Sequence, residues 1–455
     1  MDSKYEQLAE TGVSAQKLAD IFLEDYFEGN TPVFPINPFE IIRHHGILFT
    51  LKPFKKYEGV YIPPNDEKDI PVIAINAKRP ITRQRYTAAH ELCHFLKDTN
   101  NSFVCNSSPR SIVEKYAEAF ASELLMPQEY LRAEAQKYVV NGYVSLDSVL
   151  RIADYFGVSF ESCLYKLAYK LKLIDGDISP EELKKKAKKY KPATKRKEKG
   201  YSEVLLYAQL FDCMDGSFSL IDNNYAHLKF KNEYIYNDSR MEGIDIEQEQ
   251  VSDIVSDLRK NKNESKFCKE NNNNIIEVAG LTLAYDFAFD NFTSDLDINT
   301  IKTINRLLFS TAPYPEYGGK YREMNTLVLG AKFETVDCWE IYEHMFDLDE
   351  KVKQLIKKTD KISISDYLLE VLKIHHQLTI IHPFQDGNGR TSRVFLNMLL
   401  LRKGISPTFL TMKEKDSYKN ALASADSSGK IDELLEVYYK SIIRSNYELS
   451  PKAIP

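Results

Sequence analysis

Hydrophobic residues follow two different periods in the first part of the chain. Residues 71–76, PVIAIN, form a short apolar run that predicts a β-strand. The apolar residues of 86–98 and 111–127 recur at helical spacing, and the second helix is expected to end at Pro127. Residues 145–174 have the spacing of two short helices around Gly157. This mixture predicts an α+β domain over residues 1–175.

The second half of the chain has mainly helical patterns, for example over residues 364–384 and 390–404. Between the halves, residues 184–199 read KKKAKKYKPATKRKEK and show no amphipathic period, which predicts a solvated linker or a frayed helix end. A contact with nucleic acid or an acidic partner is the alternative for this basic stretch. The expected division is an N-terminal domain (1–175), a basic linker (176–200), a helical region (201–292) and a C-terminal core (293–455).

Length, net charge, cysteine pattern and the lengths of apolar runs limit the classes of protein to which this chain can belong. A length of 455 residues is enough for two or more domains, and a formal net charge of −6 gives no general reason to expect nucleic-acid binding. The cysteines form no CxxC pair, the N-terminus lacks the apolar core of a signal peptide, and no apolar run is long enough to cross a bilayer. We therefore expect a cytoplasmic protein without membrane insertion.

Residues 90–94, HELCH, match the HExxH pattern within a predicted helix. One turn separates His90 from His94, so both imidazoles can reach one metal ion, and Glu91 can act as a general base toward water at that metal. A third ligand is available on the next helix, where Glu114 shares a helical side with two alanines that leave space for a close neighbour. Glu118 is a second carboxylate one turn further along.

Two segments around this motif, RQRYTAAHELCH (83–94) and EKYAEAFASELLMP (114–127), resemble the ImmA/IrrE family of metallopeptidase-like proteins. The segments PFEIIRHHGI and IADYFGVSFESCLYKL fit the same family. The resemblance implies a zincin-like fold. It also implies that His90, His94 and Glu114 bind zinc, that Glu91 acts as the base, and that the substrate is a peptide. A domain that holds metal for structure, or a sensing module with weak or selective peptidase activity, is the alternative.

Residues 382–393, HPFQDGNGRTSR, here called the signature loop, join an apolar helix to another helix that begins near Gly389. Backbone N–H groups at that helix start make a cradle for a polyphosphate, because glycine leaves them unobstructed. Asp386 offers a hard oxygen ligand to Mg²⁺, and His382 suits a general base toward a hydroxyl. The expected phosphate-binding residues are Gly387, Asn388, Gly389, Arg390 and Arg393.

The signature loop matches in full the HPFx(D/E)GNGRxxR pattern and resembles the Fic family. GGKYREMNTLVLG (318–330) looks like the flap of that family, which docks a target peptide. The resemblance implies a mainly α domain with a small β-hairpin flap. It also implies transfer of AMP from ATP to a Ser, Thr or Tyr hydroxyl of a target protein, with His382 as the base and Mg²⁺ at Asp386.

Residues 236–244, YNDSRMEGI, resemble the inhibitory motif (S/T)xxxE(G/N) of many Fic proteins. The resemblance implies that Glu242 pairs with Arg393 and prevents productive ATP binding. Asp238 stands at the Ser/Thr position, and we expect it to cap the N-terminus of an inhibitory helix near 238–258. An exposed glutamate on a charged helix is the alternative.

Three hypotheses follow for the whole chain. The first is a self-inhibited Fic adenylyltransferase fused to a zinc peptidase-like domain that regulates it, in one version by cutting the chain near the linker or between 200 and 260. The second makes the peptidase the main activity, and the third makes the N-terminal domain a module that binds targets without cutting them. By resemblance alone, both domains indicate a bacterial stress, toxin-like or phage-related setting.

Overall fold

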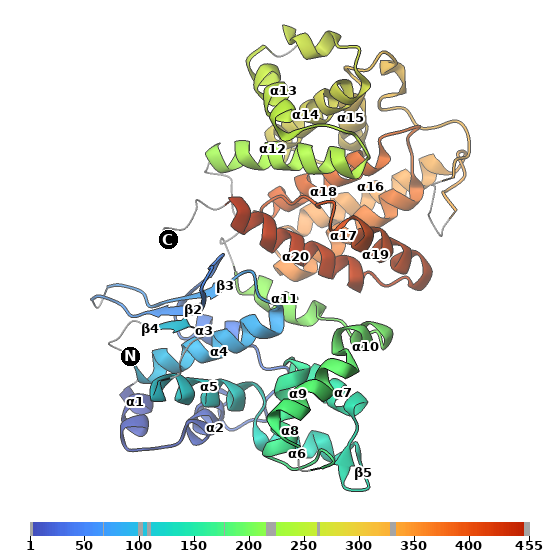
Figure 1. Cartoon of the computed structure of the whole chain (residues 1–455). Coiled ribbons are helices and arrows are strands. Elements are labelled where there is room, and N and C mark those ends of the chain that lie inside the picture. Colours follow the sequence, from blue (N-terminus) through green and yellow to red (C-terminus); the bar gives the residue numbers. More distant parts are fainter. Residues whose placement is uncertain are drawn as a thin grey trace. The chain divides into compact units, whose positions relative to one another are not determined.

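The computed structural model describes residues 3–449 except 67, 99–102, 107–110, 177, 215–223, 262–263 and 328–333. The chain divides into two compact units, Met1–Met214 (unit 1) and Asp215–Lys452 (unit 2) (Figure 1). Each unit has its own buried apolar core. The chain is therefore built from two folding bodies, as its length predicts.

Unit 1 combines helices with a small mixed sheet. Its strands are β1 (Leu48–Lys52), β2 (Tyr57–Ile62), β3 (Val72–Asn76) and β4 (Phe103–Asn106), with a short hairpin of β5 (Val139–Val140) and β6 (Tyr143–Val144). The sheet order is β1-β3-β2-β4, and only the β1–β3 pair is parallel. Its helices are α1 (Ser3–Glu10), α2 (Ala15–Tyr26), α3 (Pro38–His44), α4 (Ile81–Lys97), α5 (Ile112–Leu125), α6 (Gln128–Gln136), α7 (Leu146–Phe156), α8 (Phe160–Tyr169), α9 (Pro180–Tyr190), α10 (Pro192–Glu198) and α11 (Val204–Asp212).

Helix α4 is the central element of unit 1. It packs against β2 and β3 of the sheet and against α5, so most of its residues are buried (Figure 1). The strand predicted at 71–76 and the helices predicted at 86–98 and 111–127 are confirmed as β3, α4 and α5. Gly157 adopts φ +63° between α7 and α8, a conformation that suits glycine at a helix C-cap, and it separates the two short helices as predicted.

The basic stretch does not form a solvated linker. Residues 180–198 form α9 and α10 within unit 1, and the boundary between the units follows Met214. Ser179 and Glu182 make a capping box at the start of α9, whose apolar face buries Leu183 and Ala187. This narrow apolar face could not be recognised among the many lysines of the sequence, because only two of its positions are apolar.

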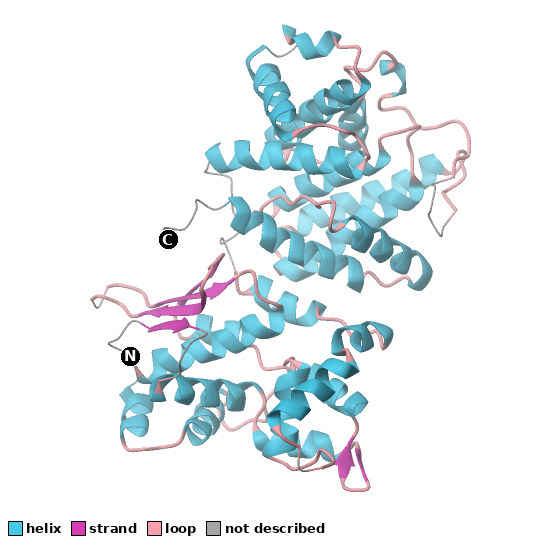
Figure 2. Ribbon diagram, in the orientation of Figure 1, coloured by secondary structure: helices cyan, strands magenta, loops and turns pink. Residues whose placement is uncertain are grey.

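Unit 2 consists of helices (cyan in Figure 2) joined by loops (pink), and its described residues include no strand. Its α-helices are α12 (Asn224–Met241), α13 (Gln248–Asn261), α14 (Asn273–Asn291), α15 (Ile298–Leu308), α16 (Ile341–Lys358), α17 (Ile364–Ile381), α18 (Asn388–Arg402), α19 (Lys415–Ser428) and α20 (Asp432–Leu449). Short 3₁₀ turns occur at Lys266–Lys269 and Pro315–Tyr317. Helix α18 lies at the centre, where it packs against α14, α15 and α17.

The predicted fold class is confirmed, with an α+β unit 1 and a mainly α unit 2. The predicted β-hairpin flap falls partly on residues 328–333, which lie outside the described residues. In its described part, Tyr321 forms one isolated bridge with Phe384 of the signature loop. No helix in the part of the chain that the structure describes is long and apolar enough to span a membrane.

Candidate functional sites

The signature loop begins where α17 ends. His382 caps α17 in the left-handed region, with φ +48°, and its N–H donates to the Leu378 carbonyl at 3.1 Å. Arg322 is buried and holds this turn, because its Nε donates to the His382 carbonyl at 2.8 Å and its backbone N–H donates to the Pro383 carbonyl at 2.9 Å. A non-glycine residue held at positive φ is a common feature of functional turns.

Asn388 braces the loop from inside. Its Oδ1 accepts from the Phe384 N–H at 2.9 Å, and its Nδ2 donates to the Phe384 carbonyl at 2.8 Å. The side chain is buried, so its amide is already used by the loop itself. One N–H of this amide is thus used by the loop, and the predicted contact of Asn388 with a phosphate stays a prediction. Its role is to fix the loop, because a planar amide matches both groups of one backbone residue.

A second buried amide, Asn305 of α15, holds the other side of the loop. Its Nδ2 donates to the Asp386 carbonyl and to Thr391 Oγ1, each at 3.1 Å, and its Oδ1 accepts from the Gly319 N–H at 2.9 Å. Gly387, the N-cap of α18, has φ +73°. These contacts fix the start of α18, where backbone N–H groups and the positive end of the helix dipole favour an anion.

Gly389 lies where the chain approaches two charged groups. A Cβ atom at this position would lie 3.0 Å from Arg393 Nη1 and 3.0 Å from Glu242 Oε1. Glycine is therefore needed here for close approach rather than for an unusual φ angle.

Each arginine of the signature loop is paired with a carboxylate from an earlier helix. Arg390 Nη1 donates to Glu277 Oε2 of α14 at 2.5 Å, and its Nη2 lies 3.8 Å from Asp386 Oδ1. The Asp386 side chain is 67% exposed, so its carboxylate is accessible to a cation. The charges of both arginines act on Glu242, although only Arg393 forms an ion pair with it.

Arg393 is held by two carboxylates from one end of α12. Its Nε donates to Asp238 and its Nη2 donates to Glu242. The Arg393 side chain is 8% exposed, that of Asp238 3% and that of Glu242 34%. Asp238 is therefore fully enclosed, whereas Glu242 faces the opening of the site.

This geometry corrects two expectations about the inhibitory motif. The helix that carries it is α12, which ends at Met241, and not a helix near 238–258. Asp238 is not an N-cap, because it lies in the last turn of α12; its carboxylate accepts from the buried guanidinium of Arg393. Lys415 Nζ donates to the Met241 carbonyl at 2.6 Å and so also anchors this helix end.

The two carboxyl groups that hold Arg393 have pKa values shifted in opposite directions. Burial raises the pKa of the Asp238 carboxyl, and the attraction of Arg393 offsets only part of that effect. Burial acts to raise the pKa of Glu242, but Arg393, Arg390 and Lys415 together outweigh it and hold that pKa below its ordinary value. Burial lowers the pKa of His382, and the nearby charge of Arg322 lowers it further, so the imidazole is neutral near pH 7 and is able to accept a proton.

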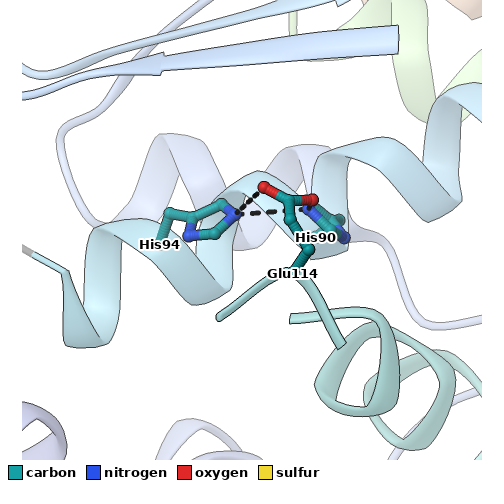
Figure 3. A group of neighbouring side chains, drawn as sticks. All are labelled: His90, His94 and Glu114. Atoms are coloured by element: carbon teal, nitrogen blue, oxygen red, sulfur yellow. Dashed lines mark hydrogen bonds and ion pairs between the residues drawn. The ribbon is translucent and has the colours of Figure 1, made fainter. Parts of the chain in front are cut away.

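The HExxH helix brings its predicted residues together in unit 1. His90 Nε2 lies 3.2 Å from His94 Nε2 and 3.2 Å from Glu114 Oε2, and one ligand atom from each residue lies within 4.8 Å of the others. Figure 3 shows the Glu114 carboxylate reaching between the two imidazoles. Two imidazole nitrogens and a carboxylate oxygen are a donor set that suits Zn²⁺. Glu114, and not Glu118, belongs to this group.

Glu91, next to His90 in the chain, is buried, and neither of its oxygens has a hydrogen-bond partner among the described residues. Burial raises its pKa well above the ordinary value, and Glu114 adds to that effect. Strand β2 passes directly over it, since a Cβ atom at Gly59 would lie 2.5 Å from Glu91 Oε1. An unpartnered buried carboxyl beside this donor set fits a residue that exchanges protons with water at a metal.

Asp98 adds a supporting contact that the sequence analysis missed. His94 Nδ1 lies 2.8 Å from Asp98 Oδ2, which leaves His94 Nε2 directed at Glu114 and His90. A carboxylate on the far nitrogen fixes the orientation and tautomer of a metal-binding imidazole. The signal was present in the sequence, because Asp98 follows His94 by one helical turn.

Comparisons with known proteins match a different family model in each of the two units. Residues 295–400 match the model of the Fic/DOC family, and residues 42–168 match that of the IrrE N-terminal-like domain. The chain contains one domain of each family.

The relatives found by sequence match the Fic domain. A protein adenylyltransferase, fic-1, of Caenorhabditis briggsae is 28% identical over 33% of this chain and 29% of its own length. The protein adenylyltransferase Fic of Drosophila melanogaster is 44% identical over 11% of each chain. The chain thus spans less than a third of the length of the curated relatives it matches. A solved structure of Fic-1 from C. elegans has a TM-score of 0.44 and 19% identity, over 72% of this chain and 92% of that one.

The residues that sequence reasoning missed in the Fic domain are Arg322, Asn305 and Glu277. Arg322 was quoted within the flap segment, but nothing in its neighbours indicates that it would hold His382. Asn305 and Glu277 lie 81 or more residues before their partners in the signature loop. Contacts over such separations leave no local signal in a single sequence.

Proposed function

We propose that the Fic domain is a self-inhibited protein adenylyltransferase that moves AMP from ATP to a Ser, Thr or Tyr hydroxyl of a target protein. The observation that supports this proposal lies at the start of α18, where Glu242 forms an ion pair with Arg393 beside Gly389. A carboxylate that holds this arginine competes with a phosphate for the same donors. The family of the domain and the named activity of its relatives support the reaction class.

The proposed reaction uses the chain's own groups in three roles. The neutral imidazole of His382 accepts the proton of the target hydroxyl, whose oxygen forms a bond to the α-phosphorus of ATP. The bond from that phosphorus to its bridging oxygen breaks, and pyrophosphate leaves. Arg390, Arg393 and the backbone N–H groups at the start of α18 stabilise the negative charge on the phosphates. The exposed Asp386 would hold Mg²⁺, which neutralises phosphate charge when bound.

The test is intact-mass and peptide mass spectrometry after incubation with ATP and Mg²⁺. Wild type, Glu242→Gly, and Glu242→Gly combined with His382→Ala are compared. We expect an AMP-sized increment on protein substrates or on the chain itself that increases with Glu242→Gly and is lost with His382→Ala. An increment of the same size in wild type and Glu242→Gly would contradict the proposed inhibition.

We further propose that unit 1 binds Zn²⁺ through His90, His94 and Glu114, which the close approach of their ligand atoms supports. Bound zinc would polarise a peptide carbonyl and activate water, and Glu91 would move the proton. Metal content after purification, compared between wild type and His90→Ala, tests the site. Glu91→Gln separates a peptidase from a module that only binds, because binding does not need the base.

A further inference from the structure

Glu277 of α14 holds the first arginine of the signature loop, although it belongs to none of the motifs in the sequence. Its Oε2 accepts from Arg390 Nη1 at 2.5 Å, across 113 residues of the chain. The Arg390 side chain is 7% exposed and that of Glu277 is 35% exposed. A hydrogen bond between a guanidinium and a carboxylate is strong, because both groups are charged. Glu277 is therefore able to fix the orientation of Arg390.

The contact with Glu277 leaves several donors of Arg390 available. A guanidinium has five N–H donors. Arg393 uses two of its nitrogens, Nε and Nη2, for carboxylates. Arg390 donates to Glu277 from one nitrogen, Nη1, and its Nη2 lies 3.8 Å from Asp386 Oδ1, which is too far for a hydrogen bond. A phosphate is therefore able to bind Arg390 while Glu277 stays in place.

One of the remaining donors of Arg390 is buried without an acceptor. Its Nε has no hydrogen-bond partner among the described residues, although the side chain is almost fully enclosed. Such a donor is unfavourable, and native proteins mostly avoid it. An anion at the start of α18 would supply the acceptor, since the backbone N–H groups of that helix start belong to the same turn as Arg390. The arginine thus has the arrangement of a guanidinium held ready for a phosphate.

Helix α14 is a firm support for Glu277. The preceding residue, Ile276, is buried, and its carbonyl accepts from Thr311 Oγ1 at 3.0 Å. Gly280 lets α14 approach α15 closely, because a Cβ atom there would lie 2.0 Å from the Leu308 carbonyl oxygen. Helix α14 also packs directly against α18. A side chain on such a packed helix is held more precisely than one on a loop.

The other carboxylates near Arg390 have different roles in the proposed reaction. Asp386, the proposed Mg²⁺ ligand, lies 3.8 Å from Arg390 Nη2. Arg390 is also close enough to Glu242 to help lower the pKa of that carboxyl. Without Glu277, the buried guanidinium would turn to one of these groups, because a buried charge needs a partner. Glu277 therefore keeps both the arginine and the magnesium ligand available to ATP.

We propose that Glu277 is a positioning residue for the phosphates of ATP, and that it stays paired with Arg390 when ATP binds. Its role is the opposite of that of Glu242, which competes with a phosphate for Arg393. This inference deepens the proposed adenylyltransferase function and rests on it for the identity of the ligand. Glu277 acts through Arg390 and does not touch the reacting atoms.

Titration calorimetry of the full chain with a non-hydrolysable ATP analogue and Mg²⁺ tests the sign of the effect. Glu242→Gly is the parent, and Glu277→Ala and Glu277→Gln are each added to it. We expect Glu277→Ala to raise the Kd about tenfold, because Arg390 loses a charged partner and its orientation. Glu277→Gln should bring the Kd back toward the parent value, since its amide oxygen still accepts from Arg390. Asp290→Ala, at an exposed carboxylate of the same helix, is the matched control and should change nothing.

Adenosine separates a positioning role from a general loss of structure. It has no phosphate for Arg390 to bind, so its inhibition constant in competition with the analogue should be the same with and without Glu277→Ala. Local misfolding would weaken adenosine and the analogue alike, and that result would overturn the proposal. Circular dichroism and thermal unfolding of each variant check that the helices are retained.

A lower Kd in Glu277→Ala would also overturn the proposal, because Glu277 would then compete with phosphate as Glu242 does. An unchanged Kd, or an analogue that binds none of the chains, has the same consequence. Transfer of AMP by the same variants separates this inference from the proposed function. If the Kd rises as expected but Glu242→Gly transfers no AMP to protein, the proposed transfer fails and the positioning role stands. If AMP is transferred with the same KM for ATP with and without Glu277→Ala, the positioning role fails and the transfer stands.

Discussion

Removal of the Glu242 carboxylate tests the proposed inhibition most directly. Arg393 is shared between Glu242, at the opening of the site, and Asp238, in its interior. A phosphate that enters from solvent is able to replace the glutamate but not the enclosed aspartate. We therefore expect Glu242→Gln to strengthen ATP binding while the Asp238–Arg393 pair remains in place.

The size of the expected gain in ATP affinity follows from how exposed the Glu242–Arg393 pair is. A hydrogen bond between charged groups contributes about 1.5–3 kcal/mol. The Glu242 side chain is about one-third exposed, so solvent screening favours the lower value. A gain of about 1.5 kcal/mol corresponds to roughly tenfold tighter binding of ATP.

Calorimetry with a non-hydrolysable ATP analogue and Mg²⁺ measures this change without any transfer reaction. Glu249→Gln, an exposed position in the first turn of α13, is the matched control. An unchanged affinity in Glu242→Gln, or an equal increase in Glu249→Gln, would refute the assignment of Glu242 as the competing group.

Asp238 should behave in the opposite way. Asp238→Ala leaves the buried guanidinium with one carboxylate fewer, and breaking an enclosed ion pair costs about 3–5 kcal/mol. Chemical denaturation should therefore show a large loss of stability for Asp238→Ala and a loss of about 1.5 kcal/mol or less for Glu242→Gln. Equal losses would mean that the two carboxylates are equivalent.

Three further predictions concern separate groups. Burial and the nearby arginine lower the pKa of His382, so transfer by the Glu242→Gly variant should persist below pH 6.5, where an ordinary histidine becomes protonated, and should fall only as the pH passes the lowered value; a midpoint at or above pH 6.5 would contradict this. Asp98→Asn should weaken Zn²⁺ affinity about 10–100-fold in chelator competition, because His94 loses its orienting carboxylate; an unchanged affinity would show that Asp98 does not act on the metal. Gly59→Ala should destabilise the chain by about 1–3 kcal/mol in denaturant, because its Cβ would overlap Glu91; normal stability would mean that β2 shifts freely.

The sequence alone determined the two domain types and most residues of the candidate sites. His90, His94 and Glu91 lie within one helical turn of each other, and the glycines and Arg390 lie within one loop and helix start, so spacing predicts their proximity. The same local logic would have predicted Asp98. Helix positions were also predictable, because amphipathic periods record which side of each helix is buried.

Only the tertiary structure decided which partner each polar group takes. Asp238 and Glu242 meet Arg393 across 155 and 151 residues, and Glu277 meets Arg390 across 113. A capping role for Asp238 was chemically reasonable from the local pattern. The tertiary structure instead pairs its carboxylate with Arg393, because a buried arginine needs a carboxylate partner. The Glu242–Arg393 pair was expected from the resemblance, but the packing of α12 against α13, α14 and α20 is what places Asp238 beside the same arginine.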